Sequence, residues 1–145
     1  MTEKERERYL FNLDEELLLG SVLFSAWDHF LILDSDTAFI RGAHLAALIT
    51  AMSGIETQLR FDHSEPGKNL RLAQLIDMSD LSADLKREIH ELRRYRNRWV
   101  HVSDTWDESL VKHMEHPETL SAEIEPWALR AVTALRKTFY WHQGT

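Results

Sequence analysis

Three side chains near position 100 have the chemistry needed to act on a phosphate group. Arg96, Asn97 and His101 all lie in the segment 96–101, which reads RNRWVH. A histidine titrates near neutral pH and can serve as a general acid or base. An arginine presents a rigid fork of donors to a phosphate oxygen that is gaining negative charge. Asn97 can orient the histidine or hold a phosphate oxygen.

The stretch that contains these residues is locally basic. Between Lys86 and His101, six basic residues stand against two acids and give a net charge of +4. The whole chain carries −7, so the remainder carries −11. An acidic protein binds nucleic acid poorly as a whole, and any such role must depend on a local patch. For Arg94 and Arg98 the plainer interpretation is that they complement the dipole at a helix C-terminus.

Arg96 is out of place in a helical projection of this stretch. With roughly 100° between successive residues, Arg96 falls in the middle of the apolar face. A guanidinium buried on an apolar helix face costs free energy unless it pairs with an acid or binds a ligand. A second, polar stripe lies on another side of the same helix and contains His90, Arg93, Asn97 and His101. The apolar face itself consists of Leu85, Ile89, Leu92, Trp99 and Val100, with Tyr95 at its edge.

Several other residues allow both a structural and a functional interpretation. His44 lies in an apolar helix, where a satisfied core histidine is the plainer interpretation and a side chain projecting into the site is the alternative. Glu56 and Arg60 have the spacing of a surface ion pair. The sharper alternative is that Glu56 holds Arg96.

Aromatic and basic neighbours of the motif are candidates for holding RNA. The plainer interpretation of Tyr95 and Trp99 is that they pack in the core, but either could stack on an unpaired base. We expect Arg93, Arg94 and Arg98 to bind phosphate, with His90 in a supporting role.

We predict no metal and no cofactor. His113 and His116 stand three residues apart in a polar stretch, and no third ligand is obvious. The chain contains no cysteine, so disulfides, thiolate metal sites and a cysteine nucleophile are excluded. Neither the GxxxxGK[ST] nor the GxGxxG phosphate loop is present.

Length and composition predict one helical domain over residues 1–145. Glycine and proline are sparse, and hairpin signals are absent. The first ten residues are charged and unlike a signal peptide, and no apolar stretch is long enough to span a bilayer. We therefore expect a cytoplasmic protein with no membrane partner.

The patterning predicts four long helices and one extra short helix, in a four-helix-bundle-like arrangement. The Asp34-Ser35-Asp36 run is expected to end the first helix and cap the second. Ser82 is expected to cap the third long helix, and Pro126 to lie in the first turn of the last. Arg130, Arg136 and Lys137 are expected on the exposed face of that last helix. The predicted ranges are 13–33, 37–61, 70–78 (short) and 82–101, followed by a closing helix through residues 127–139.

The hexapeptide resembles the signature of the HEPN superfamily, in which an arginine, usually followed by a polar residue, precedes a histidine by four to six residues. Arg96, Asn97 and His101 match that pattern. The resemblance implies a helical bundle that dimerises, so that two copies of the motif face one cleft. In toxins of this family that are paired with a nucleotidyltransferase antitoxin, a tyrosine often lies two residues after the histidine, where this chain has Ser103.

The resemblance implies a metal-independent endoribonuclease that acts as a homodimer. Attack of the ribose 2′-hydroxyl on the adjacent phosphate would leave a 2′,3′-cyclic phosphate, with Arg96, Asn97 and His101 as the catalytic residues. A toxin–antitoxin or defence setting, with an antitoxin or regulatory protein as partner, would fit. The alternatives are a noncatalytic HEPN module that binds nucleotide or RNA, and a protein-interaction module.

Overall fold

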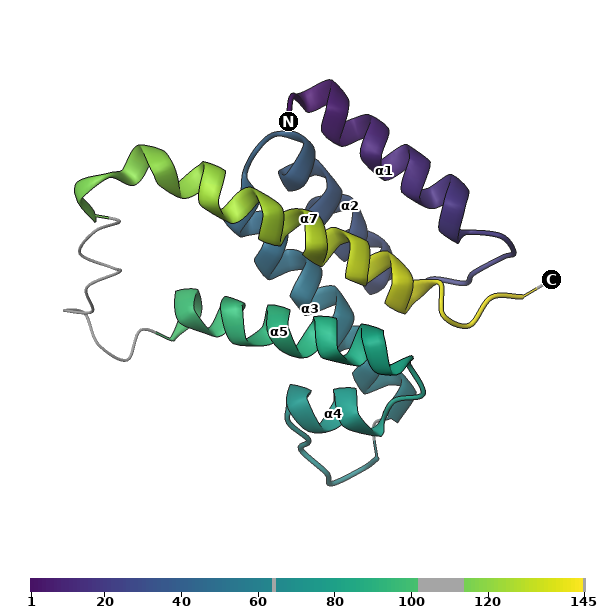
Figure 1. The fold of residues 1–145 in the computed structure, drawn as a ribbon. Helices are drawn as coiled ribbons and strands as arrows, with labels where there is room; N and C mark the ends of the chain where they lie inside the picture. Colours follow the sequence, from purple (N-terminus) through teal and green to yellow (C-terminus); the bar gives the residue numbers. More distant parts are fainter. Residues whose placement is uncertain (64, 102–113, 145) are drawn as a thin grey trace.

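The computed structural model describes residues 1–63, 65–101 and 114–144, and these residues are predominantly helical (Figure 1). Among them the β pairing is limited to an isolated bridge between Ser21 and Gly144. The predicted all-α class is therefore confirmed. The elements are α1 (Glu3–Leu17), α2 (Ala26–Ile40), α3 (His44–His63), α4 (Leu72–Met78), α5 (Ala83–Val100), the 3₁₀ turn η1 (Pro117–Thr119) and α7 (Leu120–Phe139).

Helix α3 lies at the centre and packs most extensively against α2 and α7. Its Ala47, Leu48 and Ala51 are fully buried, as expected for a helix that is apolar almost all round. Gly54 marks the closest approach to α7, because a Cβ atom at this position would lie 2.7 Å from Cδ1 of Leu135. Helix α3 is thus the buried centre of the molecule.

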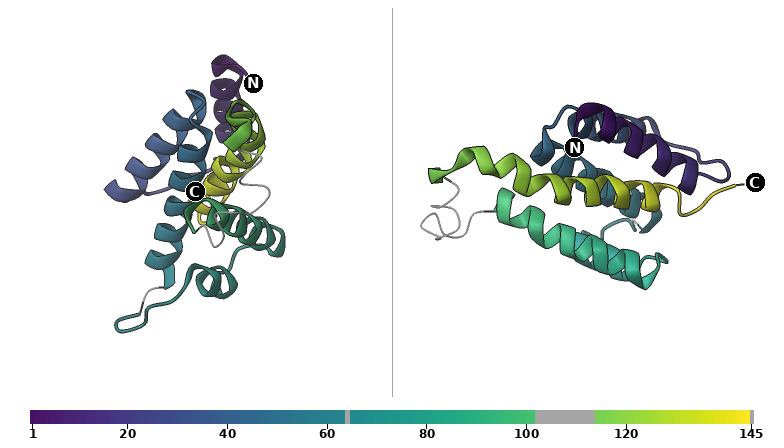
Figure 2. Two further views of the ribbon diagram at one scale, coloured as in Figure 1. Left: turned by 90° about the vertical axis from the view of Figure 1, so that its left-hand side faces the viewer. Right: turned by 45° about the horizontal axis from the view of Figure 1, so that its top comes forward.

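Helix α7 separates α1 from α5 on the other side of the molecule. The three helices lie side by side with α7 in the middle (Figure 2). The short α4 packs against α5 and α3. In the part of the chain that the structure describes, no helix combines the length and apolarity needed to cross a membrane.

The predicted first helix over 13–33 is wrong, because the structure has two helices there. Residues 18–25 form an extended connection between α1 and α2. The side-chain oxygen of Gln143 accepts hydrogen bonds from the backbone N–H groups of Leu19 and Gly20 at 2.8 and 2.7 Å. Ser25 then caps α2 by accepting from the N–H of Asp28 at 3.1 Å.

The predicted helix end at Asp34-Ser35-Asp36 is also wrong, because these residues lie inside α2. Ser35 is fully buried, and its hydroxyl donates to the carbonyl of Ala47 at 3.4 Å. The chain turns later, at Gly42, whose φ of 86° lies in the left-handed region that favours glycine. Consequently α3 begins at His44 rather than at residue 37.

The later helices follow the predictions more closely. Ser82 caps α5 as predicted, since its hydroxyl accepts from the N–H of Leu85 at 3.2 Å. The short helix is also present, as α4. Pro126 does not lie in the first turn of α7 but inside that helix, which already begins at Leu120.

Candidate functional site

Helix α5 is anchored by four buried side chains. Leu85, Ile89, Leu92 and Tyr95 form its inner face and belong to the hydrophobic core. This face is rotated slightly from the predicted one. Val100, assigned to it by the projection, is 43% exposed. Arg96 is half-buried at the margin of the face rather than enclosed within it.

The last two turns of α5 place the motif residues at one end of the helix. Nη2 of Arg96 donates to Oδ1 of Asn97 at 3.0 Å. The backbone N–H of His101 donates to the carbonyl of Asn97 at 2.9 Å, and His101 is the C-cap residue, with an exposed side chain. Nε of Arg96 is buried and has no acceptor among the described residues. The Arg96 guanidinium thus keeps an unused donor next to Asn97, which itself lies one turn before His101.

The polar stripe continues along α5 toward its N-terminus. Nε2 of His90 lies 2.8 Å from Oδ1 of Asp77, at the end of α4. The Lys86 ammonium donates to the carbonyl of Asp77 at 3.1 Å. Nε of Arg93 is buried without an acceptor among the described residues, like that of Arg96. Helix α4 therefore fixes one end of the stripe, and the motif lies at the other.

The two acids of the basic stretch are both engaged by α7. Nε of Arg130 donates to Glu88 and its Nη2 donates to Glu91, each at 2.7 Å. The Arg130 guanidinium also lies 4.3 Å from the centre of the Trp127 ring. Because Arg130 occupies both carboxylates, the cations near the C-terminus of α5 do not face free acids of their own helix.

The aromatic neighbours of the motif take part in packing. Tyr95 is buried and stacked on Trp127, with ring centres 4.0 Å apart and planes at 3°. Burial raises the pKa of the Tyr95 hydroxyl. Trp99 is half-buried and meets Tyr95 edge-on at 6.4 Å. Because the Tyr95 ring is buried, it packs in the core and is not available to stack on a base.

The remaining basic candidates point outward. Arg94 and Arg98 are exposed, and the Arg98 guanidinium lies 5.7 Å from the centre of the Tyr95 ring. Both positions lie in the last two turns of α5, where positive charge also complements the helix dipole.

Two of the three supporting candidates, Glu56 and His44, lie on α3 and have partners away from the motif. Glu56 pairs with Arg60 at 2.8 Å, so the alternative in which Glu56 holds Arg96 is not what the structure contains. His44 is buried at the start of α3, with Nε2 3.5 Å from a carboxylate oxygen of Glu125 on α7. Burial, the largest influence, lowers the pKa of His44. His44 is therefore a core histidine paired through Nε2, although its buried Nδ1 has no hydrogen-bond partner among the described residues.

The sequence interpretation missed a buried ionic cluster. Arg136 was expected on an exposed face, but it is 2% exposed and donates to Asp14 and Asp36 at 2.8 and 2.7 Å. Tyr140 donates its hydroxyl to Asp14 at 2.7 Å, and its pKa is raised by burial and by this carboxylate. The available signal was an arginine adjacent to Leu135 and one turn from Val132, both apolar core positions in α7.

Within the described residues, no group of three His, Asp or Glu side chains is arranged to hold a metal ion. His113 and Ser103 lie outside the residues that the structure describes. Comparisons with protein-family models, with curated proteins and with solved structures found no match to this chain.

Proposed function

We propose that this chain is a metal-independent endoribonuclease of the HEPN type, acting on RNA as a homodimer. One observation carries the proposal. A half-buried arginine, Arg96, has Asn97 as its sole hydrogen-bond acceptor among the described residues, and Asn97 in turn lies one turn before the exposed His101. A partly buried guanidinium whose donors lack acceptors costs free energy. The negative charge that develops on a phosphate in the transition state would supply those acceptors.

The residue types assign the steps of the reaction. A histidine takes the proton of the ribose 2′-hydroxyl, and the 2′-oxygen attacks the adjacent phosphorus. Arg96 donates to the non-bridging oxygens as their negative charge grows. The bond from phosphorus to the 5′-oxygen then breaks, and the leaving oxygen receives a proton. The products are a 2′,3′-cyclic phosphate and a free 5′-hydroxyl.

Dimerisation would supply the second proton carrier. One copy of the motif contains one histidine, and the reaction needs a base on one side of the phosphate and an acid on the other. Two copies facing one cleft provide His101 twice, so one can accept the proton and the other can donate it.

The test is a cleavage assay on mixed cellular RNA in EDTA. The parent protein is compared with His101→Ala and Arg96→Ala, with His29→Ala and Arg41→Ala as matched controls at exposed positions outside α5. Loss of the histidine or the arginine should reduce the rate roughly 10²-fold or more, whereas the controls should cleave like the parent. The 3′ ends are then analysed for cyclic phosphate.

Each outcome separates this activity from the noncatalytic alternatives. Cleavage that persists in both motif variants would contradict the proposal. Tight RNA or nucleotide binding without cleavage by a folded parent would favour the binding module instead. Cleavage that stops in EDTA and returns with a divalent cation would contradict the metal-independent mechanism.

A further inference from the structure

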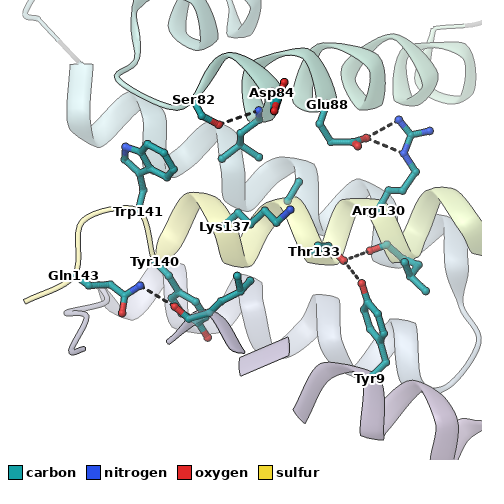
Figure 3. Close-up of a pocket in the computed structure, with 14 residues that line it drawn as sticks. Tyr9, Ser82, Asp84, Glu88, Arg130, Thr133, Lys137, Tyr140, Trp141 and Gln143 are labelled. Atoms are coloured by element: carbon teal, nitrogen blue, oxygen red, sulfur yellow. Dashed lines mark hydrogen bonds and ion pairs between the residues drawn. The ribbon is translucent and has the colours of Figure 1, made fainter. Parts of the chain in front are cut away.

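A groove runs along the outer face of α7 between α1 and α5, far larger than a single water molecule. It encloses about 700 Å³, a size that lies within the range of sites for small molecules (Figure 3). Its apolar lining comes from all three helices, through Leu17 of α1, Leu85 of α5 and Leu129 with Ala134 of α7. The lining is therefore suited to a largely apolar ligand.

Three uncharged polar side chains of the groove, Tyr9, Thr133 and Gln143, already have hydrogen-bond partners. The hydroxyls of Tyr9 and Thr133 lie 2.6 Å apart, and Thr133 donates to the carbonyl of Leu129 at 2.7 Å. Gln143 uses its amide oxygen on the connection between α1 and α2, and its nitrogen donates to the carbonyl of Leu17 at 2.8 Å. These groups leave little polar capacity for a ligand.

The charged groups are also paired, with one exception. Arg130 is occupied by Glu88 and Glu91, and Asp84 pairs with Arg87. Lys137 lines the groove, yet it has no carboxylate or hydrogen-bond acceptor among the described residues. One unneutralised cation thus remains among apolar walls and completed polar contacts.

An indole lies near this cation at one end of the groove. Trp141 follows Lys137 by four residues, just beyond the end of α7, and is 39% exposed. It makes no contact with another aromatic ring among the described residues. Figure 3 shows Lys137 in the middle of the groove, Trp141 at one end and Arg130 toward the other. A planar ring could pack on the indole while an attached anionic group reaches the ammonium.

We propose that this groove binds a small aromatic compound carrying a single anionic group, such as a carboxylate or a phosphate. The anion pairs with Lys137 and the ring packs against Trp141. One free cation specifies one anionic group, and the apolar walls specify a ligand that is otherwise uncharged. The proposal does not depend on the endoribonuclease activity, because none of its residues belongs to the motif.

The experiment uses 2-naphthoate and its neutral analogue 2-naphthamide as probes, with calorimetric titration of the full chain. We expect Lys137→Met to weaken naphthoate binding at least tenfold and to leave naphthamide binding unchanged. Trp141→Ala should weaken both probes, because both contain the ring. Lys68→Met is the matched control, since this exposed lysine pairs with Glu65 in a loop and should have no effect.

Circular dichroism establishes that each variant is folded before it is titrated. Failure of the folded parent protein to bind naphthoate up to millimolar concentration would overturn the proposal. So would a Lys137→Met variant that binds naphthoate as tightly as the parent. Equal affinity of the parent for naphthoate and naphthamide would overturn the anionic part of the assignment.

Discussion

The buried Arg136 guanidinium forms ion pairs with two aspartates and thereby connects three helices. Asp14 lies on α1, Asp36 on α2 and Arg136 on α7. A buried ion pair adds little net stability relative to an apolar replacement, but breaking it leaves charges without partners. The cluster is therefore a point of vulnerability at the scale of a single residue.

Arg136→Ala should lower the free energy of unfolding by about 3–5 kcal/mol, because Asp14 and Asp36 lose their shared partner. Urea denaturation measures the change. Arg41→Ala is the control, because the Arg41–Glu3 pair is exposed and such pairs contribute about 0–1 kcal/mol. Equal losses for the two variants would contradict the assigned role of Arg136.

His44 should make stability depend on pH. Burial holds its folded-state pKa below the unfolded value of about 6.5, so the unfolded chain binds the proton more readily. The stability that neutral His44 contributes is complete above the unfolded pKa and falls as the pH drops toward the folded one. Denaturation at pH 7.5 and 5.5 should show a larger loss for the parent than for His44→Gln. An equal loss in both proteins would count against this explanation.

At the scale of elements, local sequence signals explain α4 and α5 but neither the start of α3 nor the break between α1 and α2. Ser82 and the periodic apolar residues identify α5 because capping and amphipathicity act over short distances. Residues 18–25 are mostly apolar and continue the pattern of the helix before them. Their extended path depends on Gln143, which is distant in the sequence. The Ser35 hydroxyl likewise finds its acceptor on α3, so a local helix-stop signal was misleading.

The same division applies to the candidate site. The spacing of Arg96, Asn97 and His101 within one helix is readable from the sequence. The i,i+4 spacing also predicts the pair of Glu56 with Arg60, whereas the partner of His90 is not readable because it depends on where α4 packs. The burial of Arg136 also required knowledge of two carboxylates on other helices.

The close approach of α3 and α7 predicts that Gly54→Val is destabilising. The added side chain would meet Leu135 and Phe139, with the Cβ atom alone 2.7 Å from a Leu135 methyl group. Overpacking of this kind costs about 1–3 kcal/mol, although replacing a helical glycine recovers some backbone entropy. Thermal unfolding should show a lower midpoint, and a variant as stable as the parent would show that α7 can move away freely.

At the scale of the whole molecule, three strongly exposed apolar side chains lie on α2 and just before it. Trp27 and Phe30 on α2 are 65% and 68% exposed, and Leu23 just before the helix is fully exposed. Together these side chains present on the order of 500 Å² of apolar surface, against about 800 Å² that each partner contributes to a standard interface. The patch lies near the N-terminal end of α5, whereas His101 caps its C-terminal end, so the patch is separate from the cleft in which the proposed homodimer brings two motifs together.

For the proposed homodimer, light scattering after size-exclusion chromatography should give twice the 17.0 kDa of a single chain. Phe30→Glu should leave this mass unchanged, because the apolar patch lies away from the motif. A shift toward the monomer mass with Phe30→Glu, absent from the neighbouring charge control His29→Glu, would instead place the interface on α2. A parent protein that remains monomeric at high concentration would contradict the homodimer.

The Arg136 cluster also sets the order in which the chain can mature. Arg136 lies 122 residues from Asp14 and 100 residues from Asp36 along the sequence. While the protein is being synthesised, α1 and α2 leave the ribosome long before their cation does. Arg6 can already hold α1 against α2 through its hydrogen bond to the carbonyl of Ile40, but the ionic cluster can close only after α7 has emerged.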